Sequence, residues 1–174
     1  MPSVINFATF KIMEHLVEIV IWDEGWDETS LRRLTAERLL PRDLKVDRII
    51  QVNGDPSLLN DALKAFLEKG GASLLLTVGG SGYPPGDHVP EVTFGFLERV
   101  IPGIPEAVRE IGLSLGASAS LFRGTAGAAE GGKLIINLPG DAQWLSSSLD
   151  FLARVLGHAL DKAGGDPAEC GGGS

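Results

Sequence analysis

The sequence predicts an α/β fold with a doubly wound, mostly parallel sheet and helices on both faces. Short aliphatic and β-branched runs alternate along the chain with longer segments of helical periodicity. The runs lie at 17–22, 45–52, 73–78 and 133–138. Alternation of this kind is typical of parallel strands joined by crossover helices. With 174 residues, 44% of them hydrophobic, the chain is long and apolar enough for one domain with a buried core.

The first strand is expected at 17–22 because the run VEIVIW is rich in β-branched residues and ends at the turn-forming segment 23–25. Cap-type residues at 27–30 precede a predicted helix over 31–40. Pro41 is expected to stop this helix, since proline cannot continue the backbone hydrogen-bond ladder.

A second strand is expected at 45–52, followed by a turn at 53–55. Pro56 suits the first turn of the next predicted helix. This helix has one apolar stripe and is expected to end at the glycine pair 70–71. The continuous apolar run 73–78 predicts a parallel strand buried on both faces.

The second half repeats this alternation. Segments 89–100 and 105–113 are both predicted to be helical, and 133–138 (KLIINL) is the last clear strand. A long amphipathic helix is expected over 142–163 because its leucines recur at helical spacing.

The predicted domain covers 17–163, and the two ends of the chain differ from it. Segment 1–16 is interpreted as an extra edge strand or an extension that docks on a partner subunit. Segment 164–174 (GGDPAECGGGS) is typical of a flexible tail or linker, so an engineered chain is one interpretation. Cys170, the single cysteine, cannot form an internal disulfide, which favours the reducing cytoplasm.

Charge and hydropathy exclude two classes of partner. A formal net charge of −8 disfavours nucleic-acid binding, which depends on clustered Lys and Arg. The chain has no apolar run near the roughly 20 residues that span a bilayer, and its first residues lack the pattern of a signal peptide.

Three loops that follow predicted strands are candidates for a binding site, because open α/β sheets bind ligands at the carboxyl ends of their strands. These loops lie at 53–55, 79–87 and 138–140. The middle loop has three glycines among its first four residues and returns to a carboxylate, Asp87. Glycines at a strand end let backbone N–H groups approach a bound anion, although they also suit a tight turn without a ligand.

The segment 77–93, TVGGSGYPPGDHVPEVT, resembles the signature of the molybdopterin adenylyltransferase (MoaB/Mog-type) family of molybdenum cofactor biosynthesis. That family has a Thr-x-Gly-Gly-Thr/Ser-Gly loop, then Asp, then Pro-Glu at a helix start. The segment 122–140, FRGTAGAAEGGKLIINLPG, resembles its later Arg-x-x-Ala-Gly and Leu-Pro-Gly segments. Order and spacing agree over 17–163, and the resemblance implies the family's Rossmann-like, three-layer fold.

The resemblance also implies an activity and a set of site residues. It implies a nucleotidyltransferase that moves AMP from ATP to the phosphate of molybdopterin with Mg²⁺, and a homotrimer or two trimers stacked into a hexamer. It assigns Asp55 and Asp87 to catalysis and to the divalent metal. The residues it assigns to nucleotide and pterin binding are Gly79, Gly80, Ser81, Gly82, Arg123, Leu138, Pro139 and Gly140.

Several of these residues have a structural interpretation beside the functional one. Asp55 suits the N-cap of the helix that begins after it, and Asp87 suits a turn or a cap. Arg123 could reach a phosphate or form a structural salt bridge. Trp22 and Trp26 could stack on a pterin or base, or pack under a loop.

The chain departs from the family pattern in ways that keep two other functions open. Asp141, Ala142 and Gln143 follow Leu-Pro-Gly, where the family has a small hydroxyl residue, proline and a basic residue. Phe122 stands where the family has serine before the arginine. An inactive or engineered scaffold subunit with the family fold is one alternative. A related nucleotide hydrolase is the other.

Overall fold

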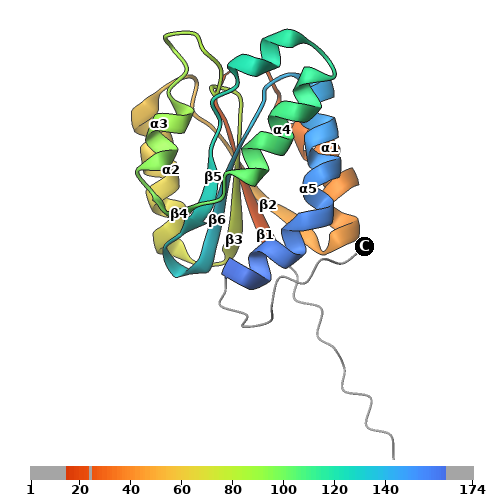
Figure 1. Cartoon of the computed structure of the whole chain (residues 1–174). Coiled ribbons are helices and arrows are strands. Elements are labelled where there is room, and N and C mark those ends of the chain that lie inside the picture. The colour runs from red at the N-terminus through yellow and green to blue at the C-terminus, as the bar shows by residue number, and fades with distance from the viewer. Residues whose placement is uncertain (1–14, 24, 164–174) are drawn as a thin grey trace, which may run out of the picture.

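The computed structural model describes residues 15–23 and 25–163, with side chains described up to residue 160. It has three layers, with one mixed sheet between two layers of helices (Figure 1). The strands are β1 (His15–Ile21), β2 (Leu44–Gln51), β3 (Ala72–Val78), β4 (Leu97–Val100), β5 (Ala126–Ala129) and β6 (Lys133–Leu138). The helices are α1 (Glu28–Leu39), α2 (Pro56–Lys69), α3 (Val89–Phe94), α4 (Gly103–Leu113) and α5 (Ala142–Ala163), with short 3-10 turns η1 (Leu40–Arg42), η2 (Ala117–Leu121) and η3 (Glu130–Gly132).

The sheet has six strands in the order β2-β1-β3-β6-β5-β4. The first four in this order are parallel, and β5 and β4 run antiparallel to their neighbours. The chain passes from β1 to β2 on one side and then to β3 on the other. The carboxyl ends of β1 and β3 therefore form the switch point at which doubly wound sheets bind ligands.

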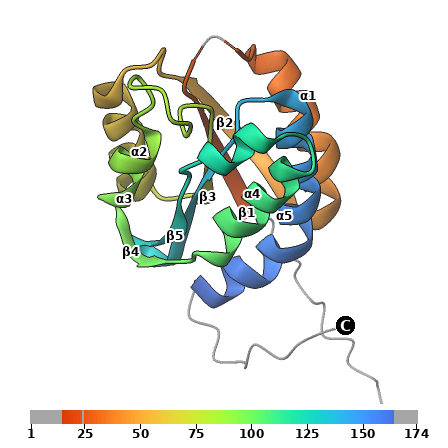
Figure 2. The ribbon, with the colours of Figure 1, turned by 45° about the horizontal axis from the view of Figure 1, so that its top comes forward.

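Two hydrophobic clusters hold the layers together. Residues of α1, α4 and α5 pack on one face of the sheet, and residues of α2 and α3 pack on the other. Figure 2 shows these two groups of helices on either side of the strands. The strand β3 contributes to both clusters, with Leu74 and Leu76 on one face and Leu75 on the other. This confirms the doubly wound α/β fold and the two-sided burial predicted for 73–78.

Helices α1 and α2 each begin after an aspartate that caps the first turn. The Asp27 carboxylate accepts a hydrogen bond from Ser30 N over 2.9 Å, and the Asp55 carboxylate accepts one from Ser57 N over 2.8 Å. Each bond satisfies a backbone donor that the first helical turn leaves without a partner. Pro56 occupies the first turn of α2, as predicted.

Two sequence predictions were wrong in the second half. The helix expected over 89–100 ends at Phe94, and 97–100 forms β4 instead. Gly95 caps α3, and the following residues gain antiparallel pairing with β5 that a local pattern does not reveal. The strand β5 itself was not predicted. The segments 1–14 and 164–174, predicted as an extension and a tail, lie outside the described residues; His15 and Leu16 belong to β1.

Candidate functional site

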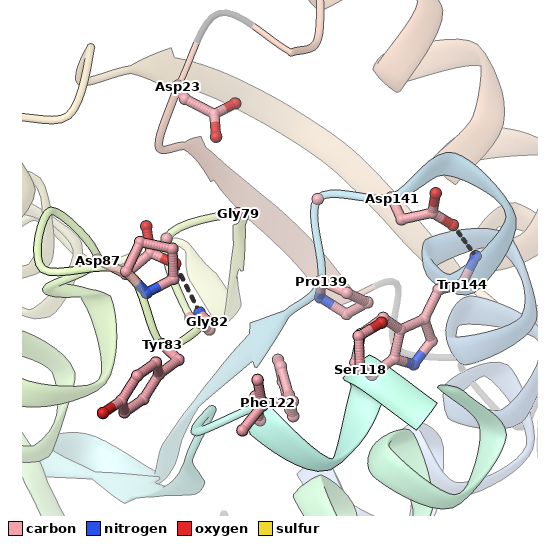
Figure 3. A pocket seen from close by; sticks show the side chains of 15 residues that line it. Asp23, Gly79, Gly82, Tyr83, Asp87, Ser118, Phe122, Pro139, Asp141 and Trp144 are labelled. Atoms are coloured by element: carbon pink, nitrogen blue, oxygen red, sulfur yellow. Dashed lines mark hydrogen bonds between the residues drawn. The ribbon is translucent and has the colours of Figure 1, made fainter. Parts of the chain in front are cut away.

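A cavity of about 380 Å³ opens at the carboxyl ends of β1, β3 and β6, which is the switch point of the sheet. Figure 3 shows this cavity between the loop after β3 and the loop after β6. Its lining residues are Asp23, Gly79, Gly80, Ser81, Gly82, Tyr83, Pro84, Asp87, Ser118, Leu121, Phe122, Pro139, Gly140, Asp141 and Trp144. The predicted glycine loop and the predicted Pro139-Gly140 turn therefore meet at one site.

The glycine loop leaves β3 in a backbone conformation that favours glycine. Gly79 has a φ of +86° and Gly80 a φ of +67°. A Cβ at Gly80 would lie 2.6 Å from Cγ2 of Val89 and would also meet the Trp22 ring. Trp22 is only 4% exposed and packs in the core under this loop. Of the two interpretations of Trp22, packing is the one that the structure supports.

Ser81 is a lining residue of the cavity, and its hydroxyl is buried. The residue is 2% exposed, and its Oγ has no hydrogen-bond partner among the described residues. Its backbone oxygen is occupied, since it accepts from Arg123 N over 2.8 Å. A buried hydroxyl without a partner costs free energy, so this atom is suited to a polar group of a ligand.

Asp87 lies on the opposite arm of the same loop. Its Oδ2 accepts a hydrogen bond from Gly82 N over 2.7 Å, drawn as a dashed line in Figure 3. This bond closes the segment between the two residues and fixes the carboxylate at the wall of the cavity. Asp87 thus has the turn role that the sequence allowed, and it also lines the cavity.

Two further carboxylates line the cavity, and one of them, Asp23, lies beside Gly79 at the start of the glycine loop. Asp141 caps α5, because its Oδ1 accepts from Trp144 N over 2.9 Å. Asp23 follows β1, and its Oδ1 accepts from Gly25 N over 2.9 Å. Together with Asp87 they give the cavity three carboxylates, and its lining contains no Lys, Arg or His. Helix N-termini favour negative charge, which stabilises Asp141 in this position.

The carboxylates do not form a metal cage by themselves. Within 15–23 and 25–163, no three His, Cys, Asp or Glu side chains are grouped so that they could hold a metal ion. Mg²⁺ commonly takes one or two protein carboxylates and completes its shell with water and phosphate oxygens. The oxygen donors at this cavity fit an ion that enters together with a phosphate ligand.

The other end of the cavity is apolar and comes from a different part of the chain. Phe122 and Trp144 pack with ring centroids 5.2 Å apart at an angle of 59°. Tyr83 is 71% exposed and Leu121 is 51% exposed at the cavity mouth. The cavity therefore has both carboxylates and apolar or aromatic side chains in its lining, which suits a ligand with a charged group and a flat ring.

Three residues expected in the site do not line this cavity. Asp55 caps α2 through its carboxylate, and Leu138 is fully buried with its backbone oxygen bonded to Gly79 N over 3.1 Å. Arg123 forms an ion pair with Glu91 and donates to two backbone oxygens of the glycine loop. Their assignment to ligand or metal binding stays a prediction.

Comparison with known proteins agrees with this geometry. Residues 27–158 match the family model described as "probable molybdopterin binding domain". The chain belongs to this molybdopterin-binding family of molybdenum cofactor biosynthesis. The resemblance and the fold class predicted from the sequence are both confirmed.

Two curated relatives are identical to this molybdopterin-binding domain at about a third of the aligned residues. The molybdenum cofactor biosynthesis bifunctional protein of Synechococcus elongatus is 37% identical over 109 residues, which is 63% of this chain and 34% of that protein. The molybdopterin adenylyltransferase of Haemophilus influenzae is 30% identical over 105 residues, or 60% of this chain and 53% of that protein. The chain thus spans about a third to a half of the length of these relatives.

Solved structures match the domain over almost its whole length. The molybdopterin biosynthesis enzyme MoaB of Thermus thermophilus has 32% sequence identity and a TM-score of 0.74, with 90% of this chain and 100% of that chain covered. The molybdopterin biosynthesis Mog protein of Mycobacterium ulcerans has 33% identity and a TM-score of 0.69, with coverages of 86% and 99%. Among the described residues of the domain, no helix has the length and hydropathy needed to cross a membrane.

Some lining residues of the molybdopterin-binding domain were not predicted. Asp23 directly follows a strand whose carboxyl end borders the switch point, so strand position alone could have indicated it. Ser118 and Leu121 belong to η2, which follows a helix, and no local signal relates them to the glycine loop. Trp144, near the start of α5, also lines the cavity.

Proposed function

We propose that this chain is a molybdopterin adenylyltransferase-like protein, which transfers AMP from ATP to the phosphate of molybdopterin with Mg²⁺. Membership of the molybdopterin-binding family supports the substrate class, and a relative at 30% identity carries the adenylyltransferase name. The proposal includes a homotrimer, or a hexamer of two trimers, and a cytoplasmic location. All of these go beyond what family membership establishes.

The observation that carries the proposal is the buried, unpartnered hydroxyl of Ser81, a residue of the glycine loop that lines the cavity together with Asp87. A phosphate oxygen would accept a hydrogen bond from this hydroxyl. Gly79 and Gly80 line the cavity and have positive φ values, so this part of its wall is bare backbone. Phosphate is the anion that glycine loops at strand ends commonly bind.

In the proposed reaction an oxygen of the pterin phosphate forms a bond to the α-phosphorus of ATP. The bond from that phosphorus to the bridging oxygen breaks, and pyrophosphate leaves with the electron pair. The protein aligns the reacting phosphates through the glycine loop and the Ser81 hydroxyl. The apolar wall of Phe122 and Leu121 holds a flat ring and keeps water away from it.

A bound Mg²⁺ ion would supply positive charge to the phosphates, which the cavity lining does not offer. Asp87 and Asp23 would hold it, since both present carboxylate oxygens at the polar end. Asp55 is proposed to assist from the start of α2, the role that the family resemblance implies for it.

Isothermal titration calorimetry with ATP and Mg²⁺ tests this function. The wild-type protein is expected to bind, and Ser81→Ala is expected to bind roughly tenfold more weakly because the phosphate loses a hydrogen bond. Asp61→Asn, a matched change of an exposed residue on α2, serves as the control and should bind like the wild type. Lack of binding by the wild type at millimolar nucleotide would disprove the enzymatic function.

A second candidate is an inactive or engineered subunit that keeps the fold as a scaffold. The observation that favours it is the cavity lining itself, with three carboxylates and no cationic side chain. This candidate predicts a stable oligomer, measured by light scattering, without binding of ATP. A nucleotide hydrolase, the third candidate, would release phosphate or pyrophosphate from ATP when no pterin is present.

A further inference from the structure

Arg123 makes four contacts with the glycine loop and the helix that follows it. Its Nε donates to the backbone oxygen of Gly82 over 2.7 Å, and its Nη2 donates to that of Asp87 over 2.8 Å. Its Nη1 forms an ion pair with the Glu91 carboxylate, and its backbone N donates to Ser81 O over 2.8 Å. One residue from outside the loop thus connects both of its arms to the start of α3.

The loop depends on these contacts because it has few others. Residues 83–86 are exposed, and the segment is closed internally by the bond from Gly82 N to Asp87 Oδ2 and by Asp87 N donating to Pro84 O over 2.9 Å. Arg123 holds the two backbone oxygens at the ends of this closed segment. It therefore sets where the Asp87 carboxylate lies relative to the Ser81 hydroxyl.

The guanidinium charge is already compensated by Glu91. Burial alone would raise the pKa of the Glu91 carboxyl, but the hydrogen bond and charge of Arg123 outweigh it, so the pKa is lowered. Arg123 does not line the main cavity, where a phosphate would be bound. The Arg123 guanidinium donates to three acceptors, and these bonds orient it toward the loop and α3.

We infer that Arg123 is a positioning residue, which shapes the nucleotide site through the glycine loop and does not contact the anion, and that Glu91 fixes its guanidinium in that orientation. This rests on the proposed function in one respect, since it takes the cavity to hold a nucleotide. The rigidity of the loop itself is independent of any ligand.

Three variants separate positioning from direct contact with phosphate. Arg123→Lys keeps the positive charge but cannot donate to three acceptors in one plane. We expect it to bind ATP with Mg²⁺ roughly tenfold more weakly, close to the loss in Arg123→Gln. Glu91→Gln is the decisive variant, because it removes the negative charge that compensates the guanidinium. If Arg123 only positions the loop, Glu91→Gln should bind ATP about threefold more weakly than the wild type. If Arg123 contacts the phosphate, Glu91→Gln should bind ATP more tightly.

Amide hydrogen exchange without nucleotide provides a readout that does not depend on the proposed function. In Arg123→Gln, the amides of Gly82 and Asp87 should exchange at least tenfold faster, while those of β6 and α5 keep their wild-type rates. Unchanged exchange at these two amides would overturn the inference, as would tighter ATP binding by Glu91→Gln. If Arg123→Gln does not fold, both ATP binding and amide exchange are measured on Glu91→Gln. Absence of ATP binding by the wild type would disprove the function and leave the exchange result to decide the inference.

Discussion

The indole of Trp22 lies against Gly80, at the point where β3 passes into the glycine loop. A Cβ at Gly80 would lie 2.6 Å from the Trp22 Cδ1 atom, closer than real Cβ atoms come to other heavy atoms. Trp22 follows β1 and is nearly fully buried. The glycine loop therefore rests on the core, and its first turn requires both a positive φ and the absence of a side chain.

Gly80→Ala should destabilise the protein by about 3 kcal/mol, because it combines a left-handed backbone with a steric clash in the core. Gly86→Ala in the same loop is the matched control, since a Cβ there meets no atom within 4 Å. The control is expected to change the unfolding free energy by no more than about 0.5 kcal/mol. Urea denaturation of the two variants measures both values, and equal stabilities would contradict the prediction.

Asp141 is expected to weaken the binding of an anionic ligand. It is exposed at the cavity rim and follows the Leu-Pro-Gly turn. Asp141→Asn keeps the side-chain oxygen that caps α5 but removes the negative charge. At an effective dielectric of about 20, two charges about 4 Å apart repel by about 4 kcal/mol, and exposure reduces this considerably.

We therefore predict that Asp141→Asn binds ATP with Mg²⁺ roughly three- to tenfold more tightly than the wild type, an effect that decreases at high salt. Asp61→Asn gives the same change in net charge on α2 and should leave the affinity unchanged. Titration calorimetry at low and high salt measures the difference. Equal affinities of Asp141→Asn and the wild type would show that the ligand phosphates do not approach this carboxylate.

The parts of the fold that were predictable are those with a local cause. The run 73–78 is apolar because both of its faces are covered, and Pro56 begins α2 where the cap residue Asp55 precedes it. β5 had no such signal, since its sequence AGAA has low strand propensity. Its conformation comes from pairing with β4 and β6, which are brought to it by the fold.

In the candidate site, too, some parts could be predicted from the sequence and others could not. The glycine loop and Pro139-Gly140 were predictable because they stand at strand ends and match a family motif, and Asp87 because it matches the motif shortly before α3. The role of Arg123 was not, because its acceptors are 32 to 41 residues away along the chain. Sequence spacing indicates a charged residue near the loop but not which atoms its guanidinium meets.

Asn137 joins three elements beneath the site. Its amide nitrogen donates to the hydroxyls of Thr77 in β3 and Thr93 in α3, each over 3.0 Å, and its Oδ1 accepts from Thr125 N over 3.0 Å. Asn137 is buried, and its two bonds to the threonine hydroxyls are buried with it, while the bond from Thr125 N is partly buried. A fully satisfied buried network of this kind fixes the relative positions of its strands and helix.

Asn137→Leu is expected to lower the unfolding free energy by about 3 kcal/mol, because it removes two buried hydrogen bonds and leaves the partly buried Thr125 N–H without an acceptor. Thr93→Val removes a single partner of the same network and should cost about 1 kcal/mol. Chemical denaturation of both variants tests this order. A Thr93→Val variant less stable than Asn137→Leu would show that the network is not centred on the asparagine.

Lys133 stabilises the carboxyl end of α2 from the start of β6. Its Nζ donates to the backbone oxygen of Phe66, which is one of the last carbonyls of that helix, and lies 4.5 Å from the centre of the Phe66 ring. A cation near a helix C-terminus and over an aromatic face is favourable. Burial lowers the pKa of the Lys133 amine from its ordinary value, although the Glu18 carboxylate opposes this shift.

Lys133→Met should therefore destabilise the protein by about 1 kcal/mol at pH 7, through the lost hydrogen bond and cation–π contact. The difference between wild type and variant should grow with pH. The folded protein holds the Lys133 proton less tightly than the unfolded chain does. In the pH window just below the ordinary pKa of 10.5, the unfolded chain therefore carries more protons than the folded protein. The unfolding free energy of the wild type consequently increases with pH in that window. The methionine side chain of the variant does not titrate, and the remaining groups cancel in the comparison. Urea unfolding at pH 8 and at pH 10.5 measures the two differences, and a constant or narrowing gap would contradict the lowered pKa.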